Sequence, residues 1–185
     1  MTTPPSKQYT SSELIESSGA IFSNLSTSPK TVCLLYYQTK NEWLLAKGRR
    51  NIDESRQDAA LRELREETGY SARLVPVRMY TRAPPAPYSQ VDGTGHVPDV
   101  PDVPDVPRLH DALTEPFMLS VRPLSGGVKI IWWYIAALDE RVDSGVQSAG
   151  EEQFSSEFVP FDEALERLSY QGDREVLERA MELVQ

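Results

Sequence analysis

Three glutamates recur at helical spacing within the stretch from Gly48 to Tyr70. At about 100° per residue, Glu63, Glu66 and Glu67 fall within one sector of a helix roughly 100° wide. Exposed like charges at this spacing repel one another by about a few tenths of a kcal/mol per pair. A cation between them would reverse that sign, and carboxylate oxygens are ligands that Mg²⁺ and Mn²⁺ prefer. The acids therefore predict a divalent-metal site suited to a phosphate-bearing substrate.

The helix that carries these acids has a predicted start and end. Ser55, followed three residues later by Asp58, forms a capping box, and Gly69 stands where a left-handed C-cap residue is expected. An adjoining sector is apolar and is expected to pack on a core: Ala60, Leu61 and Leu64. The pattern predicts one capped helix with its acidic sector beside its packing face.

The spacing of these residues resembles the Nudix box. Five residues separate Gly48 from Glu54, and seven separate Glu54 from Arg62. The remaining matching positions are Glu63, Leu64, Glu66, Glu67, Gly69 and Tyr70. Tyr70 is aromatic where the family usually has an aliphatic residue, which affects local packing only. The resemblance implies an α+β Nudix fold, an α/β/α sandwich around a mixed β-sheet, and hydrolysis of a diphosphate linked to another moiety.

The same resemblance implies a metal site and its ligands. Glu66 and Glu67 are expected to bind Mg²⁺ or Mn²⁺, with help from the Gly48 carbonyl. Glu63 is expected either to bind metal or to accept the proton of the attacking water. Metal that bridges the diphosphate oxygens withdraws charge and lowers the pKa of bound water.

Two further parts of the site follow from the resemblance. Arg62 is expected to pair with Glu54 and to hold the loop against the helix. Nudix relatives often bring another glutamate to the metal from a later loop. Glu151 and Glu152 are the metal-ligand candidates here, Glu157 is a weaker one, and a solvated acidic loop is the alternative interpretation.

A short run of cations next to the acidic helix is the candidate substrate-binding group: Lys47, Arg49 and Arg50. Cations there would hold phosphate oxygens while the glutamates hold metal. Solvated loop charges are the alternative, with more weight for Arg50 than for Lys47. The run Lys47-Gly48-Arg49 resembles the Lys-Gly-Arg found before the box in many Nudix enzymes that act on dinucleoside polyphosphates. The leading substrates are therefore dinucleoside polyphosphates or diphosphoinositol polyphosphates.

Two other functions remain open at this point. An ADP-sugar or similar nucleotide diphosphate is the second substrate class, because Pro84 and Pro85 lie about where ADP-ribose-cleaving relatives carry a proline. The distinctive Trp- and Pro-containing run of NADH-cleaving relatives is absent from this sequence. A non-catalytic nucleotide sensor or scaffold is the hypothesis from another class. Turnover with Mg²⁺ would separate enzyme from sensor.

Composition limits the class of protein. A chain of 185 residues supports one domain of ordinary size, and a formal charge of −9 argues against general binding of nucleic acid. Cys33 is the one cysteine, so no disulfide forms within the chain, and a reducing compartment fits. His96 and His110 both lie in a proline-rich stretch and give no support for a zinc site. The polar N-terminus has no apolar run long enough for a signal peptide or membrane span, so we expect the cytoplasm, with the nucleus left open.

The expected organisation is a flexible leader over residues 1–16 and a single domain over 17–185. A proline-rich insertion at about 83–111 holds half of the 14 prolines and a threefold Val-Pro-Asp repeat. A tolerated loop is its first interpretation, and a docking site for a protein partner is the alternative. Strands are expected at Ser18–Leu25, Thr31–Gln38, Glu42–Lys47, Ser71–Arg82, Glu115–Pro123, Val128–Leu138 and Gln153–Phe161, and two helices at Phe161–Tyr170 and Asp173–Gln185.

Overall fold

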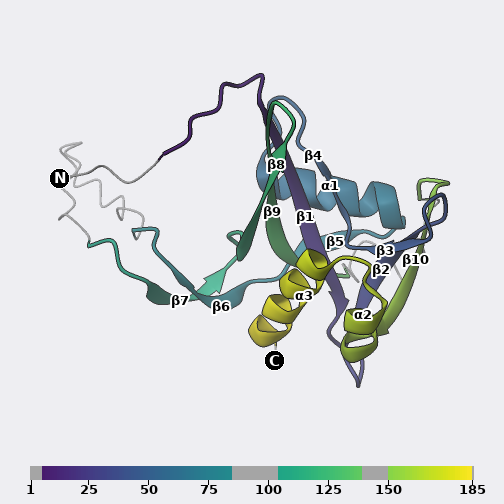
Figure 1. Ribbon diagram of the computed structural model, residues 1–185. Helices are drawn as coiled ribbons and strands as arrows, with labels where there is room; N and C mark the ends of the chain where they lie inside the picture. The colour runs from purple at the N-terminus through teal and green to yellow at the C-terminus, as the bar shows by residue number, and fades with distance from the viewer. Residues whose placement is uncertain (1–5, 85–103, 139–149, 185) are drawn as a thin grey trace.

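The computed structural model describes residues 6–84, 104–138 and 150–184, and within them lie ten strands and three helices (Figure 1). The strands are β1 (Leu14–Asn24), β2 (Thr31–Tyr37), β3 (Glu42–Leu44), β4 (Lys47–Arg49), β5 (Ala72–Leu74), β6 (Val77–Thr81), β7 (Arg108–Leu113), β8 (Met118–Leu124), β9 (Gly127–Leu138) and β10 (Phe154–Pro160). The helices are α1 (Arg56–Thr68), α2 (Phe161–Arg167) and α3 (Gln171–Leu183). None of these helices is long and apolar enough to cross a membrane.

The main sheet is mixed, as the Nudix resemblance implied. Its central path runs β10-β2-β1-β9-β5, with β3, β4 and β8 each paired to one strand of that path. The pair β1–β9 is parallel, with Leu14 opposite Val128 at one end, while the other pairs in this sheet are antiparallel. The apolar strand β9 lies inside the sheet, which satisfies its backbone on both edges. A separate two-stranded sheet joins β6 to β7.

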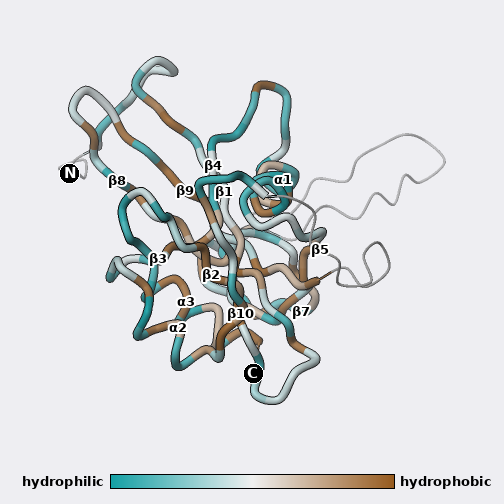
Figure 2. Tube along the Cα trace, turned by 90° about the vertical axis from the view of Figure 1, so that its right-hand side faces the viewer, coloured by the Kyte–Doolittle hydropathy of each residue, from teal (hydrophilic) through white to brown (hydrophobic). Residues whose placement is uncertain are grey.

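Side chains alternate between the two faces of the central strands and build a core on each. On β1, Ile21 belongs to the core under α2 and α3, whereas Phe22 belongs to the core under α1. On β9, Trp133 joins the first core and Tyr134 the second. Figure 2 shows hydrophobic residues along these inner strands. Helices therefore cover both faces, and the fold is the expected α/β/α sandwich.

The core under α1 explains the unusual residue at the end of the motif. Tyr70 packs against Phe22 and Phe158, with ring centroids 5.9 Å and 5.5 Å away. Aromatic pairs at this separation add to stability beyond area burial. Cys33 lies in the same core, as expected, and burial raises the pKa of its thiol to about 12, so the thiol is a packing group.

Four expected boundaries differ from the structure. Residues 14–16, expected within the leader, belong to β1, which begins at Leu14 and pairs with β9. The expected strand Glu42–Lys47 is two strands, since β3 pairs with β2 and β4 with β1. Likewise Ser71–Arg82 is divided into β5 and β6. The insertion expected at 83–111 ends early, because β7 begins at Arg108; its residues 85–103, with most of the Val-Pro-Asp repeat, lie outside the described residues.

Candidate active site

The acidic helix begins and ends where its sequence predicts. The Ser55 side chain accepts a hydrogen bond from the Asp58 backbone N–H, which caps α1. Gly69 closes the helix in the left-handed region at φ 77°, and its N–H donates to the Arg65 carbonyl at 2.8 Å. A residue with a side chain is strained in that conformation. The two caps fix which turn of α1 faces β4.

Strand β4 touches α1 at two of the acids. Gly48 lies so close to Glu63 that a Cβ atom at position 48 would be 1.8 Å from Oε2 of Glu63. One residue earlier, the Lys47 backbone N–H donates to Oε2 of Glu67 at 2.9 Å. Glu67 is buried at 9% exposure. Only a residue without a side chain lets the strand and the carboxylate approach in this way.

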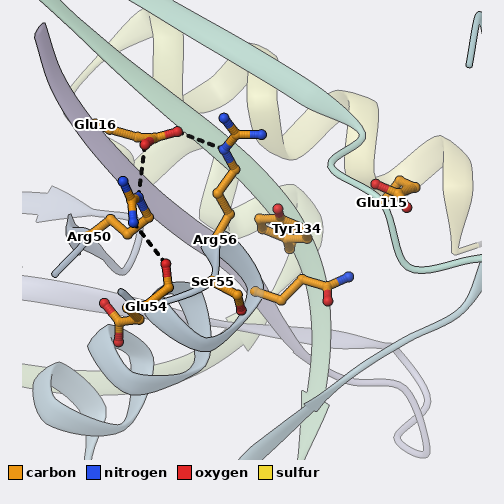
Figure 3. Close-up of a pocket in the computed structure, with 8 residues that line it drawn as sticks. Glu16, Arg50, Glu54, Ser55, Arg56, Glu115 and Tyr134 are labelled. Carbon is orange, nitrogen blue, oxygen red and sulfur yellow. Dashed lines mark hydrogen bonds and ion pairs between the residues drawn. The ribbon is translucent and has the colours of Figure 1, made fainter. Parts of the chain in front are cut away.

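The loop from β4 to α1 is tied down by Arg50, at the edge of a pocket of about 400 Å³ (Figure 3). Its Nε donates to Oε2 of Glu16 at 2.8 Å, and its Nη1 donates to the Glu54 carbonyl at 2.9 Å. The guanidinium of Arg50 is thus engaged with the loop and with β1. Substrate binding by Arg50 stays a prediction; in the structure its guanidinium contacts the loop and β1.

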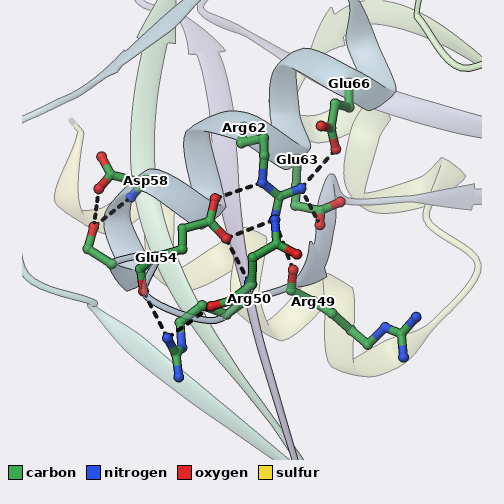
Figure 4. Close-up of polar contacts among 9 residues, drawn as sticks. Arg49, Arg50, Glu54, Asp58, Arg62, Glu63 and Glu66 are labelled. Carbon is green, nitrogen blue, oxygen red and sulfur yellow. Dashed lines mark hydrogen bonds and ion pairs between the residues drawn. The ribbon is translucent and has the colours of Figure 1, made fainter.

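Arg62 makes hydrogen bonds to several groups around α1 (Figure 4). Its guanidinium donates to both carboxylate oxygens of Glu54, at 2.7 Å and 3.0 Å, and to the Arg49 carbonyl at 2.9 Å. Its Nη1 also donates to Glu63 and to Glu66, each at 2.8 Å. The bidentate pair with Glu54 matches the contact that the motif implied. One guanidinium therefore connects the loop, β4 and two of the three acids.

Burial and crowding raise the pKa values of two acids. The pKa of the Glu67 carboxyl rises to about 8, chiefly because the group is buried, with Glu63 and Glu151 adding repulsion. The pKa of Glu63 is also raised, first by burial and then by Glu66 and Glu151, while Arg62 opposes the shift. These carboxylates have less positive charge around them than their ionised forms require. A bound cation would supply it.

The acidic residues of the site offer oxygen ligands of the kind that a divalent metal requires. Among residues 6–84, 104–138 and 150–184, no three acidic, histidine or cysteine side chains converge closely enough to hold an ion as they lie. Arg62 accounts for part of this, because it occupies one oxygen of Glu63 and one of Glu66. The all-oxygen donor set, the raised pKa values and the space left by Gly48 fit a hard divalent cation.

Of the later glutamates, Glu151 is the one nearest the acidic helix. Its backbone N–H donates to the Glu66 carbonyl at 2.9 Å, and its charge contributes to the raised pKa values of Glu63 and Glu67. Glu152 is exposed. Glu157 lies on β10 and forms an ion pair with Arg167 at 2.8 Å, which gives it a structural partner.

A cluster of four cations lies on the sheet face covered by α2 and α3. Burial lowers the pKa of Lys129, and the nearby charges of Lys47, Arg122 and Arg49 lower it further. Cross-strand pairing places Lys129 opposite Arg122, and Lys47 opposite Gly19, in the same face as Ile21. We call Lys47, Arg49, Arg122 and Lys129 the cation cluster.

The sequence interpretation missed two members of this region. Arg122 joins the cation cluster and donates to Oδ1 of the buried Asp173 at 3.3 Å. Burial raises the pKa of Asp173, while Lys47 and Arg122 oppose that shift. Strands β8 and β9 form a hairpin that turns at Gly126, and their antiparallel pairing places Arg122 opposite Lys129. The sequence of the hairpin alone could have predicted this pair. No sequence pattern predicted the position of Asp173, because it lies on α3, far from β8 and β9 in the sequence.

Comparison with known proteins agrees with the fold and the motif. The NUDIX domain family model matches residues 25–180. Among solved structures, an Ap4A hydrolase of C. elegans superimposes with a TM-score of 0.56 at 13% identity, covering 91% of this chain and 97% of that one. A NUDIX hydrolase from Nitrosomonas europaea gives 0.53 at 10% identity, over 91% and 88% of the two chains. The dihydroneopterin triphosphate pyrophosphohydrolase of E. coli gives 0.51 at 14%, over 89% and 92%.

At these identities the structural likeness establishes the fold, whereas the family match rests on most of the chain. A search of curated proteins returned no match. The matched range includes the whole motif from Gly48 to Tyr70 and the strands of the main sheet other than β1, and it ends within α3. The chain therefore belongs to the Nudix family and is a Nudix hydrolase that acts on phosphoanhydrides.

Proposed function

We propose that this enzyme hydrolyses a small molecule with several closely spaced phosphates, a dinucleoside polyphosphate or a diphosphoinositol polyphosphate, with Mg²⁺ or Mn²⁺. The observation that carries the proposal is the cation cluster, two of whose members, Lys47 and Arg49, lie on β4 on either side of Gly48, the residue that lies against Glu63 of the acidic helix. Lys47 takes part in both, since its backbone contacts Glu67 while its side-chain charge acts on Lys129. Phosphate oxygens and metal ligands would thus meet at β4.

Glu66 and Glu67 are the proposed metal ligands, with the Gly48 carbonyl beside them and Glu151 as the later glutamate. When bound, the metal supplies positive charge that stabilises the phosphate oxygens and acidifies water. Glu67 already has one oxygen on the Lys47 N–H, which orients its carboxylate. Glu63 serves as a ligand or as the base that accepts the water proton at its carboxylate. Arg62 and Glu54 hold the loop and the acids in register.

The cation cluster supports a polyphosphate over a single diphosphate. Burial lowers the pKa of Lys129, and its three cationic neighbours lower it further, so bringing the four cations together costs free energy in the protein without substrate. A substrate with many negative charges removes that repulsion and gains an attraction with each added phosphate. A substrate with two phosphates and neutral flanks would leave part of the cluster unpaired.

The fold relatives do not decide between substrates. One is described as an Ap4A hydrolase and another as a dihydroneopterin triphosphate pyrophosphohydrolase, so one fold serves both kinds of chemistry. The choice for this chain rests on its own side chains. The experiment is a kcat/KM panel with Mg²⁺ over diadenosine tetraphosphate, a diphosphoinositol pentakisphosphate, ADP-ribose and NADH. ADP-ribose as the best substrate would replace the proposal with the ADP-sugar alternative.

A further inference from the structure

Glu16 on β1 holds both ends of the loop between β4 and α1. Its Oε2 accepts from Nε of Arg50 at 2.8 Å, at the loop's first residue. Its Oε1 accepts from Nε of Arg56 at 2.6 Å, at the first residue of α1. Figure 3 shows the Glu16 carboxylate between the two guanidinium groups. One side chain thus joins two points six residues apart in the chain.

A third partner fixes Glu16 itself. The indole Nε1 of Trp132, on β9, donates to Oε1 of Glu16 at 2.9 Å. The guanidinium of Arg56 stacks on the Trp132 ring at 4.4 Å from its centroid. Both oxygens of Glu16 are therefore occupied, and its side chain is only 16% exposed. Glu16 lines the pocket of Figure 3 as a support for its walls, since its oxygens are already committed to protein donors.

Polar contacts hold this loop, because Arg62 of α1 contacts the Glu54 carboxylate and Glu16 of β1 contacts Arg50. Ile52 is 91% exposed, and Asp53 adopts a positive φ of 60°. The Glu54 carboxylate accepts from the Asn51 N–H at 2.8 Å, which stays within the loop. Loops with little buried apolar surface open at low free-energy cost unless polar contacts hold them. In the described part of the chain, the contacts that tie this loop to the main sheet come from Glu16.

The contacts of Glu16 with Arg50 continue, through Glu54 and Arg62, to the acids of α1. Arg50, held by Glu16, donates to the Glu54 carbonyl at 2.9 Å. The Glu54 side chain in turn holds Arg62, and Arg62 contacts Glu63 and Glu66. We infer that Glu16 is a positioning residue for hydrolysis, which sets Glu54 through Arg50 and so orients Arg62 and the acids of α1. The inference rests on the proposed assignment of those acids to the active site.

The test compares Glu16→Gln with Glu115→Gln. Gln keeps the size of Glu16 and loses its charge, while Glu115 lines the same pocket and serves as the matched control. We expect Glu16→Gln to lower kcat about tenfold or more with KM changed less than about threefold, because orientation and not substrate contact is lost. Hydrogen exchange at residues 50–55 should accelerate about fivefold or more, with α3 unchanged as internal reference. Glu115→Gln should leave kcat and exchange within about twofold of wild type.

A double-mutant cycle tests the route. Because Glu16 acts through Arg50, Glu16→Gln should add less than about twofold to the kcat loss of Arg50→Met. Unchanged kcat in Glu16→Gln, full additivity with Arg50→Met, or lost activity with exchange raised throughout the protein would each overturn the inference. Failure of the proposed substrate class looks different. Wild type would then prefer ADP-ribose, and the same variants would be compared on that substrate, with the exchange result unaffected.

Discussion

Gly48 and Glu63 approach so closely that a Cβ atom at position 48 would lie 1.8 Å from the Glu63 carboxylate oxygen. The atoms in the way belong to the end of a flexible side chain, so the fold has a way to relieve the clash. The carboxylate would have to move, and with it the contact that Arg62 makes with Oε1 of Glu63 at 2.8 Å. Adding a methyl group at position 48 would therefore displace the carboxylate of Glu63.

Gly48→Ala should therefore separate folding from activity. We expect a loss of about tenfold or more in kcat, since Glu63 is displaced, with a melting temperature within a few degrees of wild type. Activity assays and thermal unfolding of the same preparations measure both. Gly172→Ala is the matched control, because no heavy atom lies within 4 Å of a Cβ atom built at position 172. An active Gly48→Ala enzyme would show that Glu63 needs no fixed position.

Removing the charge of a proposed metal ligand should abolish most turnover. Glu66→Gln and Glu67→Gln keep side-chain size and remove an anionic ligand, so we expect kcat/KM to fall by about a hundredfold or more, about 3 kcal/mol of transition-state stabilisation. Circular dichroism should show an intact fold. Near-full Mg²⁺-dependent turnover in both variants would contradict the assignment of these glutamates.

The stability of the metal-free protein should depend on pH through Glu67. Its pKa in the folded state is about 8, above the ordinary value of 4.5, so the folded protein holds a proton that the unfolded chain has released. This contribution is fully present below about pH 4.5 and is lost as pH rises through about 8. Without Mg²⁺, the melting temperature of Glu67→Gln minus that of wild type should increase between pH 5 and pH 8.5. A difference that is constant over this range would show that Glu67 titrates normally.

Much of the site was predictable because its signals are local. The caps at Ser55 and Gly69, and the pairing of Arg62 with Glu54, depend on residues within about one motif. These local rules explain why the helix, its acids and its bounds were predicted from the sequence. The register of α1 against β4 is then set at Gly48, which lies against Glu63, and at Lys47, whose N–H donates to Glu67.

The remainder depends on pairing between distant segments. Glu16 was placed in the leader, because nothing near it signals that β1 extends to Leu14 through pairing with β9. The start of β7 at Arg108 depends likewise on β6, after a long proline-rich stretch with no periodic pattern of its own. The contact between Arg50 and Glu16 of β1 likewise joins residues 34 positions apart, and no local pattern signals it. Side chains of adjacent residues at the end of a strand point to opposite sides, so Arg49 and Arg50 have different neighbours.

Replacing Lys129 should raise the stability of the protein and lower its affinity for a polyphosphate. Burial and three neighbouring cations lower the pKa of Lys129, so Lys129→Met removes repulsion in the empty protein and should raise its melting temperature by a few degrees. The same variant should bind a polyphosphate more weakly, since one cation is lost. Thermal unfolding with and without inorganic tripolyphosphate measures both effects. A variant that is less stable and equally stabilised by tripolyphosphate would show that Lys129 has only a packing role.

The most direct test of the central claim is kcat/KM for diadenosine tetraphosphate and for ADP-ribose, with Mg²⁺, in wild type, Lys47→Met and the remote control Lys40→Met. We expect wild type to prefer the tetraphosphate. Lys47→Met should reduce this preference about fivefold or more, mainly through KM, because a point charge gains more from a substrate with more phosphates. Lys40→Met should match wild type. A wild-type preference for ADP-ribose, or an equal loss on both substrates in Lys47→Met, would contradict the claim that the cation cluster selects a polyphosphate.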